Sequence, residues 1–338
     1  MATPRNIIGG WRAVSLTKQP NIITAVAVNT LLPFMGDPME SAVNTNYVNS
    51  DQITGNLLAT RHKVLNYKME GKHKDKATPH LIALFASQCM GKDTATAVAA
   101  STAFLHKLEI DQAVVELPYR TMVENDGDKQ WRFPGVTCVG FTLSGKRGEF
   151  LDFEADLVGR DEVEEDGTVV TLTAKPALVA ESYLTYCDAN LKQGGTFTAG
   201  AHTGAPTVIS SQLKDFKFSF KNGGSGKYLF GDASCAVGQI RRGKNYEAML
   251  EATIEIDDRT YRSQMRQGSE FVMSIPIVGE IANAAVRYSA ELVFPKVALM
   301  EAPKKVEDDG ALAYAGKFQI FDSFFLNITN LHSTSYLA

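Results

Sequence analysis

Two long stretches of the chain alternate between apolar and polar side chains, which is the pattern of an antiparallel strand with one buried face. Residues 63–73 place Leu65 and Met69 on one face, with charged and amide side chains on the other. Residues 246–257 alternate more regularly, and their polar face carries several carboxylates. Shorter strands are predicted at residues 104–110, 139–143, 150–158, 216–220, 271–277, 286–294 and 317–322.

Only two helices are predicted. The first runs from Pro79 to about Met90, with Thr78 as its N-cap and Gly91 just past its end. Its apolar residues fall on one stripe, which predicts packing of one face against a sheet. The second is shorter and covers residues 258–267, before a glycine that stops it.

Each long alternating strand runs directly into a predicted helix, and more strands follow each helix. The two halves share this pattern but little residue identity, so the repeat is one of layout. We therefore predict a mainly β protein with few helices, built as two tandem β-sandwich domains, each with a flanking helix. The predicted divisions are an N-terminal arm at 1–40, a first domain at 41–190, a Gly/Thr/Ala/Ser-rich linker at 191–212 and a second domain at 213–330.

The composition supports a folded, water-soluble chain. With 44% apolar and 21% charged residues among 338, it differs from disordered chains, and no apolar run is long enough to span a membrane. The most apolar early stretch, residues 21–35, has too many polar breaks for a secretory signal. A net charge of −4 disfavours tight, sequence-independent binding of nucleic acid. The four cysteines show no C-x-x-C spacing and are predicted to be reduced, mostly buried thiols.

No catalytic, cofactor or metal-binding residues emerge from the motifs. The six histidines lack metal-ligand spacing, and Gly223–Gly226 lacks the ending of a phosphate-binding loop, so a turn is predicted there. Asp152, Glu154 and Asp156 share one strand face and predict an acidic surface. The basic stretch at residues 61–76, with Lys74 and Lys76 placed in the turn before the first helix, predicts an exposed charged face or protein contact. We predict that the chain is not an enzyme.

Several short stretches resemble the major tail tube proteins of long-tailed bacteriophages. The resembling stretches are Gln52-Ile53-Thr54-Gly55-Asn56, the helix end Leu84-Phe85-Ala86-Ser87-Gln88-Cys89-Met90-Gly91, Leu117-Pro118-Tyr119-Arg120-Thr121, Phe133-Pro134-Gly135-Val136 and the strand pair between Gly140 and Gly159. Residues 43–160 resemble the tube-domain pattern, and residues 213–323 resemble it more weakly.

The resemblance implies a structural virion protein, a major tail tube subunit that polymerises into stacked rings around a conduit for phage DNA during ejection. It implies a non-contractile, siphovirus-like tail assembled in the host cytoplasm. The implied partners are other copies of the chain, in trimeric (pseudo-hexameric) or hexameric rings, and the tape measure, tail tip and tail terminator proteins. DNA passes without specific binding, no membrane is involved, and no cofactor is needed.

Tube domains of this kind each give about four inner strands, so six domains close a barrel of about 24 strands and on the order of 50 Å across. We expect the lumen to be acidic, so that DNA slides along it. The expected lumen residues are Asp152, Glu154, Asp156, Glu247, Glu251 and Glu255. The N-terminal arm and the loop at 44–54 are the expected contacts between rings.

Two alternatives remain open from the sequence. Another ring-forming tail protein, such as a terminator, shares these features but forms single rings that do not stack. A carbohydrate-binding β-sandwich module needs exposed aromatic platforms, and the chain has only Trp11 and Trp131 as tryptophans.

Overall fold

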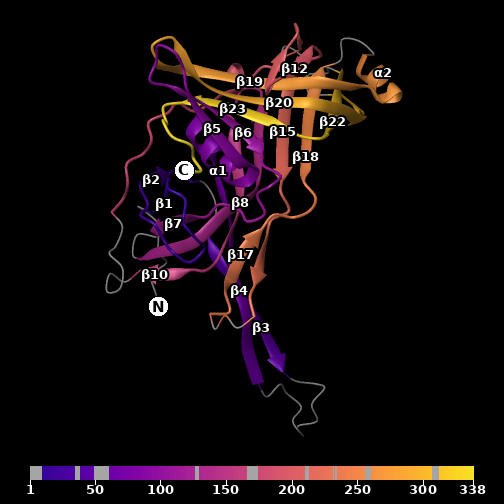
Figure 1. Ribbon diagram of the computed structural model, residues 1–338. Coiled ribbons are helices and arrows are strands. Elements are labelled where there is room, and N and C mark those ends of the chain that lie inside the picture. The colour runs from indigo at the N-terminus through magenta and orange to yellow at the C-terminus, as the bar shows by residue number, and fades with distance from the viewer. Residues whose placement is uncertain are drawn as a thin grey trace.

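The mainly β fold class is confirmed. The computed structural model describes residues 10–34, 39–48, 61–125, 129–165, 174–209, 213–230, 232, 234–255, 260–306 and 312–338. Within them, nineteen strands connect into one large antiparallel system, and two further hairpins stand apart from it. The large system folds into two facing layers and a smaller sheet beside them (Figure 1).

The first layer, named here the charged sheet, runs through both halves of the chain without a break. In spatial order its strands are β3 (Glu40–Val48), β4 (Arg61–Lys76), β9 (Asp152–Gly159), β8 (Gln130–Lys146), β15 (Leu213–Lys221), β18 (Glu247–Glu255) and β22 (Leu312–Ile320). The two halves join where β8 pairs with β15, with Phe218 opposite Leu143. Beyond the body, β3 and β4 continue as a long projecting hairpin (Figure 1).

The second layer, named here the back sheet, lies across the upper part of the molecule (Figure 1). In spatial order its strands are β5 (Gly91–Ala97), β6 (Phe104–Ile110), β23 (Phe325–Asn330), β20 (Val286–Glu301), β19 (Glu270–Asn283), β11 (Lys192–Gln193) and β14 (Thr207–Val208). The end of β20 also pairs with β22, and β21 (Lys304–Val306) extends that edge. One strand therefore belongs to both layers.

The third sheet uses the N-terminal part of β8. Its other strands are β2 (Thr30–Leu32), β1 (Trp11–Val14), β7 (Arg120–Asn125) and β10 (Val163–Glu165). The guanidinium group of Arg12 is fully buried, donates to Glu124 Oε2 at 2.8 Å and stacks on Phe34. This buried ion pair fixes the early segment onto the body.

The remaining elements connect these sheets. The segment at 191–212, expected as a linker, carries β11, β14 and the hairpin of β12 (Thr196–Thr198) and β13 (Ala201–Thr203). After β15, Gly223 adopts a φ of +63° in the turn that leads to the hairpin of β16 (Ser225–Tyr228) and β17 (Val237–Arg241). A 3-10 turn covers Tyr186–Asp188, and α2 (Thr260–Gln267) ends before Gly268.

Helix α1 (Pro79–Met90) begins and ends where the sequence predicts, with the Thr78 hydroxyl accepting from Leu81 N and Gly91 in the left-handed region. However, all twelve of its residues are buried, whereas the stripe of apolar residues predicted burial of one face. The helix lies between the two layers and contacts β8 on one side and β6 on the other. Its polar Gln88 is satisfied there by the carbonyl oxygens of Pro118 and Val136.

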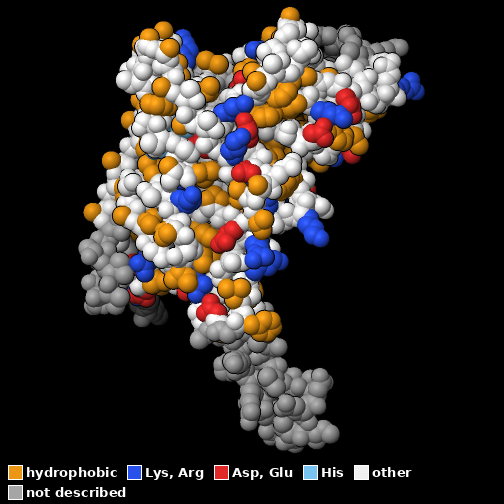
Figure 2. Space-filling model, viewed as in Figure 1, with side chains coloured by type: hydrophobic (Ala, Val, Ile, Leu, Met, Phe, Trp, Pro, Cys, Tyr) orange, Lys and Arg blue, Asp and Glu red, His pale blue; other side chains and the backbone are white. Residues whose placement is uncertain are grey.

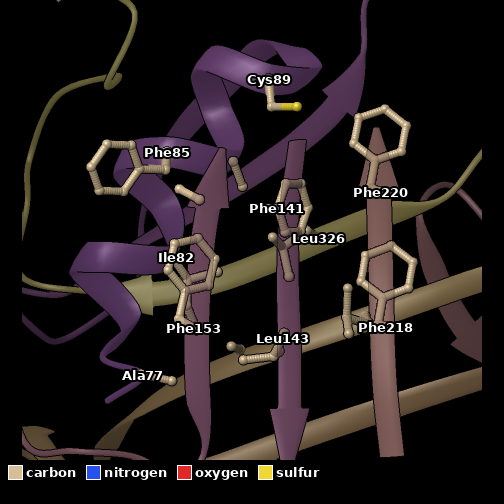
Figure 3. Close-up of a cluster of buried hydrophobic side chains, with 14 of the residues drawn as sticks. Ala77, Ile82, Phe85, Cys89, Phe141, Leu143, Phe153, Phe218, Phe220 and Leu326 are labelled. Atoms are coloured by element: carbon tan, nitrogen blue, oxygen red, sulfur yellow. The ribbon is translucent and has the colours of Figure 1, made fainter. Parts of the chain in front are cut away.

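A single main hydrophobic core fills the space between the layers. Figure 3 shows Phe85 of α1, Phe141 and Phe153 of the first half and Phe218 of the second pointing into it. Phe218 packs edge-on against Phe141 with ring centroids 5.8 Å apart. Both halves thus bury their apolar residues in the same core.

Candidate functional site

The outer surface of the charged sheet carries the largest organised set of ionisable side chains among the described residues. Along each strand, the residues that point away from the core are mainly Lys, Asp, Glu, Ser and Thr. We name this surface the charged face. It holds eight lysines and eight carboxylates on β4 to β22: Lys68, Lys72, Lys74, Lys76, Lys146, Lys217, Lys221 and Lys317, and Glu70, Asp152, Glu154, Asp156, Asp215, Glu247, Glu251 and Glu255.

The strand register places opposite charges side by side. Lys76 of β4 faces Asp152 of β9, and their side chains are 2.6 Å apart. At the other end of the same row, Glu251 of β18 lies between Lys217 and Lys317. Opposite charges facing each other across strands favour this register. The charged face is therefore striped by strand, basic on β4 and acidic on β9 and β18.

This register corrects the expectation of an acidic face. The expected carboxylates do share one face, but each row that contains them also contains lysines. Lys72 pairs with Glu154 and lies 3.5 Å from Asp156, and its hydrogen bond to Glu154 raises the lysine pKa. Glu255 lies 3.4 Å from Arg147 and 3.5 Å from Lys214. Sequence reasoning weighed each strand alone, whereas the balance of charge depends on which strands are neighbours.

The placement of Lys74 and Lys76 in a turn was wrong. Strand β4 continues to Lys76 because its pairing with β9 continues to Asp152, and only two residues separate it from α1. The basic stretch is thus part of a charged strand face, which is one of the two interpretations that the sequence predicted. Of the expected contacts between rings, residues 1–9, 35–38 and 49–54 lie outside the described residues.

A second group of ionisable side chains is buried around the C-terminal segment, and the sequence analysis did not predict it. Tyr336 is fully buried, and its hydroxyl lies 2.7 Å from His80 Nδ1 on α1. Its backbone N–H donates to Asp93 Oδ2 at 2.6 Å, and Arg120 donates to its carbonyl oxygen. These contacts come from segments far apart in the sequence, so no local pattern identifies them.

Burial determines the ionisation of this cluster. It lowers the pKa of His80 to about 3 and that of His332 to about 4, which keeps both neutral at pH 7. It also lowers the pKa of Arg120 to about 10. The carboxylate of Glu181 accepts a hydrogen bond from the backbone N–H of His80 at 2.6 Å, and burial raises the Glu181 pKa to about 7.

Replacing Glu181 with glutamine should stabilise the protein at pH 8 but have little effect at pH 5. The pKa of Glu181 is about 4.5 in the unfolded chain and about 7 in the folded protein. The contribution of this carboxyl group to the stability of the fold therefore decreases as pH rises through that range. Glutamine keeps the acceptor for the His80 backbone N–H without the buried charge, so we expect a gain of about 3 kcal/mol at pH 8. Urea unfolding at both pH values measures it, with exposed Glu149→Gln as the control. An equal shift at both pH values contradicts the prediction.

The cysteines are free, and two of them, Cys89 and Cys138, are buried as expected, whereas Cys187 is exposed. Across the described residues, no three His, Cys, Asp or Glu side chains come together in a way that could hold a metal ion. Neither helix in the described part of the chain is long and apolar enough to cross a membrane.

Comparison with known proteins supports the resemblance inferred from the sequence. The family model described as phage tail tube protein matches residues 21–316, which is most of the chain and includes both halves. No curated protein matches it. Proteins of this family are structural components of the virion tail. With a match of this extent over a mainly antiparallel β fold, the chain belongs to the phage tail tube protein family.

Proposed function

We propose that this chain is the major tail tube subunit of a non-contractile phage tail, acting as a building block rather than as an enzyme. In this proposal it polymerises into stacked rings, and the rings form a hollow conduit through which DNA passes during ejection without specific binding. The tape measure, tail tip and tail terminator proteins are its further partners. The observation that carries the proposal is the charged sheet, with one face buried and the other charged across both halves.

The number of strands supports a trimeric ring. From β3 through β22 to the end of β20, eight strands follow one another in hydrogen-bonded order. Three copies supply 24 strands, the number that six tube domains of four strands each would supply. At about 4.8 Å between strands and a tilt of about 40°, such a barrel is on the order of 50 Å wide. Residues 41–190 and 213–330 then act as the two tube domains of each chain.

The edges of the charged sheet favour closure through other copies. Within the described residues, β3 pairs only with β4. At the opposite side of the sheet, β20 also pairs with β19 as far as Ala298, so the edge consists of residues 299–301 of β20 together with β21. Unpaired strand edges are templates for further pairing, and closing a sheet into a barrel removes them. We propose that β3 of one copy meets the β20–β21 edge of the next, and that the charged face lines the lumen.

Negative-stain electron microscopy of the purified chain over a concentration series tests this proposal. We expect hollow tubes or stacked rings, with three subunits in ring averages. Six subunits per ring would replace the trimer with a hexamer in which each chain contributes half as much of the wall. Single rings that never stack at any concentration favour a terminator, and monomers that bind glycans favour a carbohydrate-binding module.

A further inference from the structure

The hairpin of β16 and β17 exposes three consecutive apolar side chains at its tip. Tyr228 is 40% exposed, Leu229 is 50% exposed, and Phe230 is fully exposed. A run of three exposed apolar residues is unusual on a soluble surface unless it binds a partner. Figure 2 shows hydrophobic side chains at the lower end of this hairpin, near the base of the β3–β4 projection. We name these three residues the apolar tip.

The hairpin that carries the apolar tip is held firmly against the body. Arg160, directly after β9, donates to the carbonyl oxygen of Val237 at 2.7 Å and to the Ser234 hydroxyl at 2.8 Å. On the other side, the backbone N–H of Ile240 donates to the Tyr119 hydroxyl at 2.9 Å. A surface fixed in this way loses little conformational entropy on binding, which favours a specific contact.

The opposite end of the charged sheet holds a pocket of about 330 Å³. Its walls combine apolar side chains, among them Leu213 and Phe216 at the start of β15, with three cations and one carboxylate, which are Lys146, Arg147, Lys214 and Asp215. Exposed Tyr186 and Cys187 also line it. We name it the basic pocket.

The two features lie at opposite ends of the same strand. The β16–β17 hairpin follows the C-terminal end of β15 and points the same way as the β3–β4 hairpin (Figure 1), whereas the basic pocket surrounds the start of β15. Nine residues of strand separate the ends by about 30 Å. A projection at one end and a pocket at the other suit head-to-tail contacts, which repeat without limit when they do not close.

We propose that the apolar tip of one copy inserts into the basic pocket of a second copy in the next ring. The inference rests on the proposed stacking of rings and names the contact that joins them. The chemistry of the two surfaces is complementary. The aromatic rings of the tip meet apolar walls and can stack beneath the guanidinium or ammonium groups of the pocket.

Cross-linking through a native cysteine tests the contact. In a Cys235→Ser background, which removes the thiol nearest the tip, Phe230→Cys should form a disulfide with Cys187 of a neighbouring copy when assembled tubes are oxidised. We expect a ladder of linked chains on non-reducing gels that extends beyond the number of subunits in one ring. Adding Cys187→Ser should abolish the ladder. Ile281→Cys, at an exposed position on β19, should not give one.

A second variant separates stacking from ring formation. Phe230→Asp places a charge in the proposed contact, and we expect rings to form while tubes require at least a tenfold higher protein concentration. Ile281→Asp is the matched control and should leave the tube threshold unchanged. The inference fails if Phe230→Asp polymerises like the parent chain, or if cross-links stop at the size of one ring. A parent chain that forms neither rings nor tubes overturns the proposed function itself.

Discussion

Replacing Glu247 and Glu251 with lysine is expected to leave tubes intact but to slow DNA ejection. The two residues lie on the acidic strand β18, and each substitution changes a charge of −1 to +1. On a face with eight lysines and eight carboxylates, this turns an even balance into a clear excess of positive charge. Lysines that neutralise phosphates hold DNA in a salt-dependent way. In the proposed trimeric ring, three copies of each substitution would multiply the effect along the whole tube.

The measurement is the rate of DNA release from virions carrying the double substitution, at low and high salt. We expect slower release that recovers as salt rises, because screening weakens each phosphate contact. The tube itself should tolerate the change, since placing three lysines in the Lys217–Glu251–Lys317 row costs only about 1 kcal/mol per facing pair at most. Glu149→Lys with Glu280→Lys, off the charged face, is the matched control. DNA release at the parent rate would contradict the proposal that the charged face lines the lumen.

Phe218→Ala is expected to destabilise both halves of the chain together. Phe218 is fully buried, and its ring lies 5.8 Å from Phe141 of the first half and 5.3 Å from Phe294 of the back sheet. Removing a buried phenyl ring leaves a cavity at a cost of about 3–5 kcal/mol. Because the core is shared, we expect one unfolding transition with a lower urea midpoint.

The two tryptophans provide a test of this coupling. Trp11 and Trp131 both lie in the first half, so their fluorescence reports on that half, while far-ultraviolet circular dichroism reports on the whole chain. Coincident shifts of both signals are expected for the Phe218 variant. Ile281→Ala, at an exposed position, should change the free energy of unfolding by no more than about 0.5 kcal/mol by either measurement. A fluorescence transition that stays in place while the circular dichroism shifts would show that the two halves unfold independently.

Much of the local structure could be predicted from the sequence, because it depends on neighbours along the chain. The N-cap, the first-turn proline and the terminal glycine define α1 to the residue, and strict alternation identifies β4 and β18. Strand ends are less predictable, because tertiary pairing decides where a strand stops. β4 therefore runs to Lys76 opposite Asp152, and β8 covers Gln130–Lys146, well beyond the predicted 139–143.

The features that the sequence did not predict depend on contacts between distant segments. The alternation of residues 152–156 predicts that Asp152 and Asp156 share a face, but it does not reveal that β4 lies beside them with its lysines. Likewise, His80 and Tyr336 are separated by most of the chain, and their hydrogen bond exists only once the C-terminal segment folds back onto α1. Neither residue type nor spacing carries that information.

The sharing of β20 between the two layers has a mechanical consequence. The end of this strand is hydrogen-bonded to β22 of the charged sheet, the earlier part is hydrogen-bonded to β19 and β23 of the back sheet, and Val297 and Ala298 pair with both β22 and β19. Close-packed interiors are poorly compressible and transmit strain, so the charged sheet cannot bend or widen without deforming the back sheet as well. In the proposed tube, this shared strand makes each subunit a stiff two-layered part of the wall. A tail that flexes should therefore bend between rings, while the diameter of the lumen within each ring stays constant.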